Sequence, residues 1–180
     1  MMKRLFATTL GAALATFGSL PSPASADDAQ VARGRYLVTI SGCSDCHTPG
    51  ALLGAPDMKR YLGGSDVGFA IPGAGVFVGQ NLTPDKETGL GGWSDAQIEK
   101  ALTTGERPDG RILASIMPWH ALAHLAKPDL AALVAYLRSL PPVSHKIAGP
   151  FGPNEKPTVF VMKVVPPPEG VVPSEPPPKP

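Results

Sequence analysis

The sequence predicts an all-α domain with three main helices, a glycine-rich loop or small hairpin, and a proline-rich C-terminal tail. Apolar residues recur at spacings of three and four over three stretches, glycine gathers between the first two, and proline gathers after the third. We expect the domain over residues 27 to 142 and the tail over residues 143 to 180. A chain of 180 residues suits one modest domain. Its net charge of +1 argues against nucleic acid as a partner.

Residues 1 to 26 have the features of a secretory signal peptide. Lys3 and Arg4 precede an apolar run that ends in the small-residue cleavage site Ala24-Ser25-Ala26. A retained membrane anchor is the alternative, but Gly, Ser and Pro residues interrupt a run shorter than the roughly 20 apolar residues of a span. We therefore expect cleavage after Ala26, no membrane span in the mature chain, and export to the periplasm.

The first helix is predicted from Asp27 to Ser41 and the second from Ser94 to Gly105. In the first, small and apolar residues share one face behind acidic residues that can cap its start. In the second, Ser94 and Gln97 have the spacing of a capping box, and Gly105 is a typical C-terminal stop.

The third helix is predicted to begin at Pro128 and to end at Pro141-Pro142, with an apolar stripe between them. Between Gly63 and Gly92, nine of thirty residues are glycine and the apolar residues alternate over short pieces, which indicates a long loop with one small hairpin. After the third helix, only a short strand within Thr158 to Val165 is expected. The rest of the tail should be extended, because proline disrupts regular structure.

The chemistry is concentrated at Cys43-Ser44-Asp45-Cys46-His47. C-x-x-C-H is the attachment signature of c-type haem. Residues three apart share a face of a helical turn, so Cys43 and Cys46 can each form a thioether to one haem vinyl group. His47 can then donate a ring nitrogen to iron as the proximal ligand. One such motif predicts one haem.

Two other uses of paired cysteines are less consistent with the sequence. A thioredoxin-like redox pair should lie near a βαβ pattern, whereas this pair follows a helix. A zinc site needs further ligands at compatible spacing, but the chain has no third cysteine and the other histidines are far downstream.

The second axial ligand of the iron decides what the haem does. After the first two residues, the candidate thioethers are Met58, Met117 and Met162, and His120 and His124 are nitrogen alternatives. Met58 is too close in sequence to His47 to reach the other haem face easily, and Met162 lies in the tail. Met117, stiffened by the proline that follows, is the predicted ligand. Its alternative role is to fill a gap in the core.

Several further stretches carry a family resemblance, and they lie within residues 31 to 143. They are Arg33-Gly34-Arg35-Tyr36-Leu37, the C-x-x-C-H site, Asn81-Leu82-Thr83-Pro84-Asp85, Glu87-Thr88-Gly89-Leu90-Gly91, Gly92-Trp93-Ser94-Asp95, Arg107-Pro108-Asp109-Gly110, Met117-Pro118 and Tyr136-Leu137-Arg138-Ser139-Leu140-Pro141-Pro142. The chain resembles class I c-type cytochromes, and more narrowly the cytochrome c subunits and domains of bacterial periplasmic alcohol and aldehyde dehydrogenases.

The resemblance implies a cytochrome c-like fold around one covalently bound haem. It implies that the first and last helices cross, with Gly34 and Tyr36 against Tyr136 and Leu137, and that Met117 ligates iron opposite His47. Those dehydrogenase subunits often carry three such domains and a membrane anchor, whereas this chain has one C-x-x-C-H motif. The chain therefore resembles a detached carrier or a small subunit more closely.

The expected function is one-electron transfer, with no catalytic residue of its own. The expected partners are a periplasmic dehydrogenase as donor and a downstream cytochrome or oxidase as acceptor. The first alternative is a haem-based sensor or small-ligand-binding cytochrome with an open or labile sixth position, and a peroxidase ranks third. Arg107 and Arg111 are candidates to pair with haem propionates, although solvated side chains are almost as consistent with the sequence.

Overall fold

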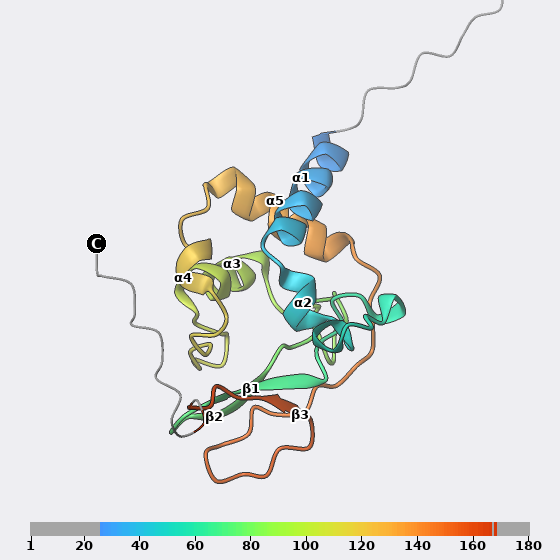
Figure 1. The fold of residues 1–180 in the computed structure, drawn as a ribbon. Helices are drawn as coiled ribbons and strands as arrows, with labels where there is room; N and C mark the ends of the chain where they lie inside the picture. The colour runs from blue at the N-terminus through green and yellow to red at the C-terminus, as the bar shows by residue number, and fades with distance from the viewer. Residues whose placement is uncertain (1–25, 167, 169–180) are drawn as a thin grey trace, which may run out of the picture.

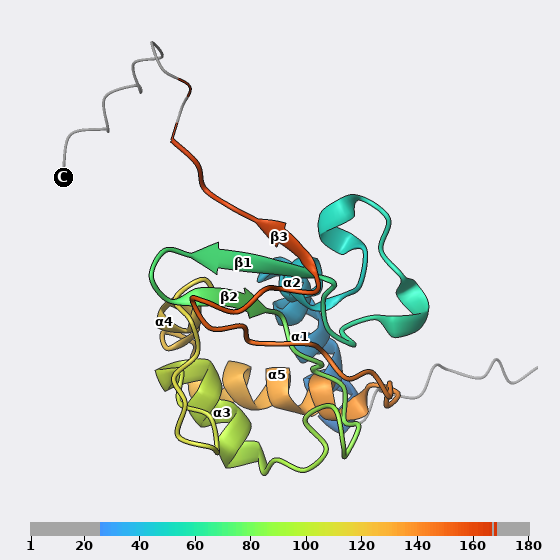
Figure 2. The same cartoon turned by 90° about the horizontal axis from the view of Figure 1, so that it is seen from below.

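The computed structural model describes residues 26 to 166 and residue 168, and the predicted signal peptide up to residue 25 lies outside this range. Its elements are α1 (Ala26–Ile40), α2 (Cys43–His47), η1 (Ala51–Leu53), η2 (Met58–Arg60), β1 (Val67–Ile71), β2 (Gly75–Val78), α3 (Asp95–Thr104), α4 (Trp119–Leu122), α5 (Lys127–Ser139) and β3 (Phe160–Met162). Figures 1 and 2 show the longer helices gathered on one side of the molecule and the small sheet on the other.

The three main helices form where the sequence predicts them, but the expectation of an all-α domain needs correction. A three-stranded sheet in the order β2-β1-β3 is present, with β1 and β2 antiparallel and β1 and β3 parallel. The predicted hairpin and the predicted tail strand are both confirmed. The tail strand β3 pairs with β1 of the hairpin and stabilises it, since a lone hairpin is only marginally stable. Of the two short helices, α2 forms at the helical turn expected for the C-x-x-C-H site, whereas α4 is not among the predicted elements, because four residues are too few to establish a period.

The longest helices, α1 and α5, cross at close range. A Cβ atom added at Gly34 would lie 1.9 Å from the carbonyl oxygen of Ala132 and 2.7 Å from Cβ of Tyr136, so only glycine allows this approach. Arg33 secures the crossing with two hydrogen bonds to Asp129, of 2.8 and 3.0 Å. The implied helix crossing is therefore present at Gly34. Tyr36 remains 54% exposed, with the Arg33 guanidinium 5.4 Å from its ring centre.

The ends of α3 and α5 are fixed by polar contacts. Gln97 N donates to Ser94 Oγ at 3.2 Å and Ser94 N donates to Gln97 Oε1 at 2.8 Å, so the predicted capping box forms, and Gly105 ends α3 with φ of 73°. From α5, Arg138 donates to Asp95 at 2.8 Å and to the carbonyl oxygens of Leu90 and Trp93. This side chain therefore holds the loop before α3 against α5.

The described part of the tail packs against the domain up to β3, and its residues after β3 are exposed, with Val164 at 97%. It runs beneath the helical layer and returns to the sheet as β3, whose first residue, Phe160, donates its backbone N–H to Asp66 O at 3.1 Å (Figure 2). The buried core lies between α1, α3 and α5, and its buried residues are Val38, Leu62, Leu90, Ile98, Leu133, Val134, Tyr136 and Leu137. None of the described helices combines the length and apolar character that crossing a bilayer requires.

We predict that Gly34→Ala destabilises the domain by about 1–3 kcal/mol, because the new methyl group has to push α1 away from α5. Guanidinium denaturation of the purified protein measures this loss. Gly92→Ala is the matched control, since its Cβ would meet only an oxygen 3.6 Å away, and it should change stability by less than about 0.5 kcal/mol. Equal midpoints for the two variants would contradict the role given to the crossing.

Candidate functional site

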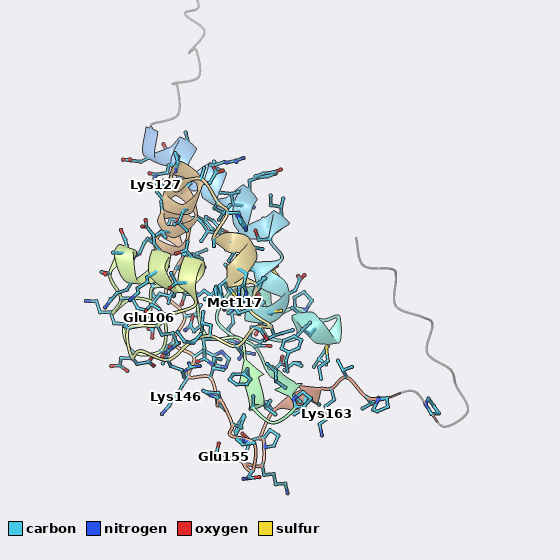
Figure 3. All side chains as sticks on the ribbon, turned by 90° about the vertical axis from the view of Figure 1, so that its left-hand side faces the viewer. Glu106, Met117, Lys127, Lys146, Glu155 and Lys163 are labelled. Carbon is cyan, nitrogen blue, oxygen red and sulfur yellow. The ribbon has the colours of Figure 1, made fainter. Side chains whose placement is uncertain are left out.

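The four predicted site residues line one cavity of about 580 Å³. Cys43, Cys46 and His47 come from α2, which Figure 1 labels, and Met117, labelled in Figure 3, comes from the loop that leads into α4. The volume is in the range of small-molecule and cofactor sites. Much of the remaining wall is apolar, contributed by Val38, Phe69, Phe77, Leu82, Leu90, Trp93, Ile98, Leu113, Leu122, Leu133 and Leu137.

The two cysteines lie one helical turn apart directly after α1. Gly42 adopts a left-handed conformation with φ of 64°, which turns the chain so that α2 begins almost as soon as α1 ends. Burial raises the pKa of Cys43 to about 11 and also raises the pKa of Cys46. Both thiols are therefore protonated at neutral pH. A thioredoxin-like pair needs a thiol with a depressed pKa, so the environment argues against that alternative.

His47 is held so that one ring nitrogen is available. The residue is 8% exposed, and Nδ1 lies 2.6 Å from the carbonyl oxygen of Gln80. Because a carbonyl only accepts, Nδ1 carries the proton and Nε2 keeps its lone pair. Burial lowers the pKa of His47, which favours the neutral, metal-ligating form. Glycine at position 79 lets the backbone before Gln80 lie against α2, since a Cβ there would lie 1.7 Å from Cys46 O.

Met117 is the one methionine of the described residues that lines the cavity. Its N–H donates to Ala114 O at 3.0 Å, and its carbonyl accepts from Trp119 N at 2.8 Å, so tight turns flank it on both sides. Met58 and Met162 do not line the cavity and are 64% and 46% exposed.

The histidine candidates for the second axial ligand also lie away from the cavity wall. His120 stacks on Trp119 with ring centres 3.4 Å apart, and neither His120 nor His124 lines the cavity. Among the described residues, no group of three or more His, Cys, Asp or Glu side chains is arranged to hold a metal ion.

Two arginines give one part of the cavity a positive charge. Arg107 lies over the Trp93 ring at 5.1 Å and pairs with Asp109 at 3.2 Å, and Arg111 lines the same wall. Burial, and secondarily the charge of Arg107, lowers the pKa of Arg111. A bound group with carboxylates would relieve this repulsion. Two thiols, an apolar wall and two guanidinium groups therefore suit a largely apolar cofactor that carries carboxylates and is attached through thiols, which is the chemistry of haem c.

Some cavity residues were missed by sequence reasoning. Gln80 contributes only its backbone carbonyl, which any residue type supplies, so it leaves no sequence signal. Lys146, Ile147 and Pro150 line the cavity from the tail, whose proline-rich composition says nothing about where it packs.

Comparison with known proteins identifies related chains. The model of the Cytochrome c family matches residues 31–141. The fructose dehydrogenase cytochrome subunit of Gluconobacter japonicus is 37% identical over 113 residues, which cover 61% of this chain and 22% of that protein. The cytochrome c subunit of the quinone alcohol dehydrogenase of Gluconobacter oxydans is 33% identical over 145 residues, covering 80% and 28%. The gluconate 2-dehydrogenase cytochrome c subunit of Pantoea cypripedii is 34% identical over 146 residues, covering 81% and 30%.

The aligned part thus spans less than a third of the length of each of these three relatives.

We predict that Gly79→Ala lowers the fraction of chains that carry covalently attached haem by at least severalfold. The added methyl group would collide with Cys46 O and separate His47 from Gln80. Helix α2, which carries both cysteines, would then lose its contacts with residues 79 and 80. Intact mass and the ratio of haem to protein absorbance measure attachment. Gly92→Ala, in the same glycine-rich region, should attach haem normally, and full attachment in Gly79→Ala would refute this role.

Proposed function

The chain belongs to the cytochrome c family, and from this membership we propose that it is a one-electron carrier whose single haem c is held by Cys43, Cys46, His47 and Met117. Family membership implies the covalent haem, and the one C-x-x-C-H motif provides for one. The observation that carries the proposal is that these four side chains, from α2 and from a loop seventy residues later, line the same cavity.

Each residue has a distinct part in this proposal. Haem iron, when bound, supplies a centre that accepts and releases one electron. Cys43 and Cys46 fix the cofactor as thioethers, His47 donates through Nε2, and Met117 donates a thioether sulfur that favours the ferrous state. The apolar wall keeps water away, and Arg107 and Arg111 pair with the propionates.

The proposed donor is a periplasmic dehydrogenase, and the proposed acceptor is a downstream cytochrome or oxidase. Support for the donor comes from relatives named as cytochrome subunits of fructose, alcohol and gluconate dehydrogenases. A periplasmic location agrees with the predicted signal peptide. We keep the proposed division of the chain into a signal peptide (residues 1 to 26), a haem-binding domain (27 to 142) and a proline-rich tail (143 to 180). In this proposal, none of the residues that the structure describes acts as a catalytic residue.

Docking is proposed at the surface beside Met117. Ile116, which lines the cavity, is 48% exposed, and Ile112 in the same loop is 55% exposed. Apolar side chains at a redox site suit a transient partner. A net charge of +1 provides little long-range steering, so local contact at this loop would have to select the partner.

The visible spectrum of the purified mature protein tests the proposal. A carrier with His and Met ligands should show sharp low-spin bands when reduced, a weak far-red band when oxidised, and no response to carbon monoxide. A haem-based sensor with an open or labile sixth position should bind carbon monoxide readily, and that result would replace electron transfer by ligand binding as the function.

We predict that Met117→Ala lowers the reduction potential by on the order of 0.1 V, within the roughly 0.8 V that axial ligation spans, and admits carbon monoxide. Redox titration and carbon monoxide difference spectra measure the two effects. Met58→Ala and Met162→Ala are the matched controls, because both side chains lie away from the cavity wall. Their spectra should match the parent protein. If Met117→Ala does so too, Met117 is not the ligand.

A further inference from the structure

We propose that residues 143 to 151, which follow the part matched by the family, form a wall of the haem cavity, and that the charge of Lys146 raises the reduction potential. This inference rests on the proposed function. Lys146, Ile147 and Pro150 line the same cavity as Cys43, although the family match ends at residue 141. Figure 3 shows Lys146 on the segment that leads from the helical part of the molecule toward Glu155.

Buried polar side chains of the domain hold the start of this segment. Val143 N donates to Thr83 Oγ1 at 3.0 Å, and Asn81 Nδ2 donates to Val143 O at 2.7 Å. Asn81 is 1% exposed and Thr83 is fully buried. Detaching the segment would leave these groups without their partners, which is costly in a buried site.

The residue before Lys146 is held from three directions. His145 N donates to Thr88 Oγ1 at 3.0 Å, and His145 Nδ1 lies 2.8 Å from Gly63 O. Arg60 Nη1, which can only donate, lies 3.3 Å from His145 Nε2. Lys146 therefore leaves a fixed point of the backbone rather than a free tail.

Glycines of the domain provide the flat surface on which the segment lies. A Cβ at Gly64 would come within 2.3 Å of Ile147 Cδ1, and one at Gly75 would come within 2.1 Å of Phe151 O. Phe151 also exchanges two backbone hydrogen bonds of 2.9 Å with Val76 in β2. The domain surface is thus shaped for this segment at both ends of the wall.

The position of Lys146 has an electrostatic consequence. Lys146 takes part in none of the ion pairs found among the described residues, although Glu87 also lines the cavity and contributes a carboxylate to its wall. A positive charge beside the cavity favours the state of the cofactor that holds one more electron. Ile147 acts differently, because its apolar side chain keeps water from the same wall.

The charge is tested on the haem-loaded protein with Lys146→Met, with Lys146→Arg as the charge-preserving control. Lys146→Met should lower the equilibrium constant for reduction about threefold to tenfold, where tenfold corresponds to about 59 mV. High salt should shrink the shift, because Lys146 is exposed. Lys146→Arg should leave the potential unchanged, as should Lys127→Met at the start of α5, far from Lys146 in Figure 3.

The wall is tested by Ile147→Ala, with Val164→Ala as the control because that side chain is 97% exposed on the same tail. Ile147→Ala should lower the equilibrium constant for reduction about twofold or more by admitting water, and salt should not affect this shift. Parent potentials in both Lys146→Met and Ile147→Ala, with an intact low-spin spectrum, would overturn this inference alone. A parent protein without haem bands would overturn the proposed function and this inference together.

Discussion

The contact between α1 and α5 at Gly34 determines where the rest of the site lies. The C-x-x-C-H helix follows α1 after a turn of two residues, so the direction of α1 sets the direction of α2. In the last turn of α5, Arg138 donates hydrogen bonds to the carbonyl oxygens of Leu90 and Trp93 and so holds the loop that carries Trp93. The part of the cavity wall that carries the cysteines and the part that carries Trp93 are therefore both attached to one pair of helices. The missing side chain at Gly34 lets that pair approach within backbone contact.

The sheet supports the site from the side opposite to these helices. Strand β2 leads directly into Gly79 and Gln80, and Gln80 O accepts the hydrogen bond that orients His47. The sheet is in turn completed by β3, which comes from the tail. The family-matched domain thus contains the proposed ligands, while the segment after it stabilises the elements that position them. This division explains why a proline-rich segment is ordered here: its partners are buried polar groups and strand edges of the domain.

Whether a feature could be predicted from the sequence depends on how far apart its interacting residues lie along the chain. The capping box at Ser94 and the C-x-x-C-H motif depend on residues three or four apart, so their sequence patterns are informative. Met117 could be chosen by elimination as the proposed ligand, since few methionines are available, and it lines the cavity. The packing of the tail could not be predicted, because its hydrogen bonds join residues about sixty positions apart. Asn81 and Thr83 have the sequence character of loop residues, and only the fold shows that they bind Val143.

The loop that carries Met117 favours a carrier over a sensor on structural grounds. A sensor needs a sixth ligand that leaves easily, whereas a carrier gains from ligands that stay fixed in both oxidation states. The loop is tied at its start, where Leu113 N donates to Gly105 O at 2.8 Å, and Glu106 bridges to Ile112. At its end, the Trp119 ring packs so closely on Gly105 that a Cβ there would lie 2.7 Å from Cε2. Because Gly105 anchors both ends of the loop, Met117 is held on a short closed segment, which opposes the displacement that ligand sensing requires.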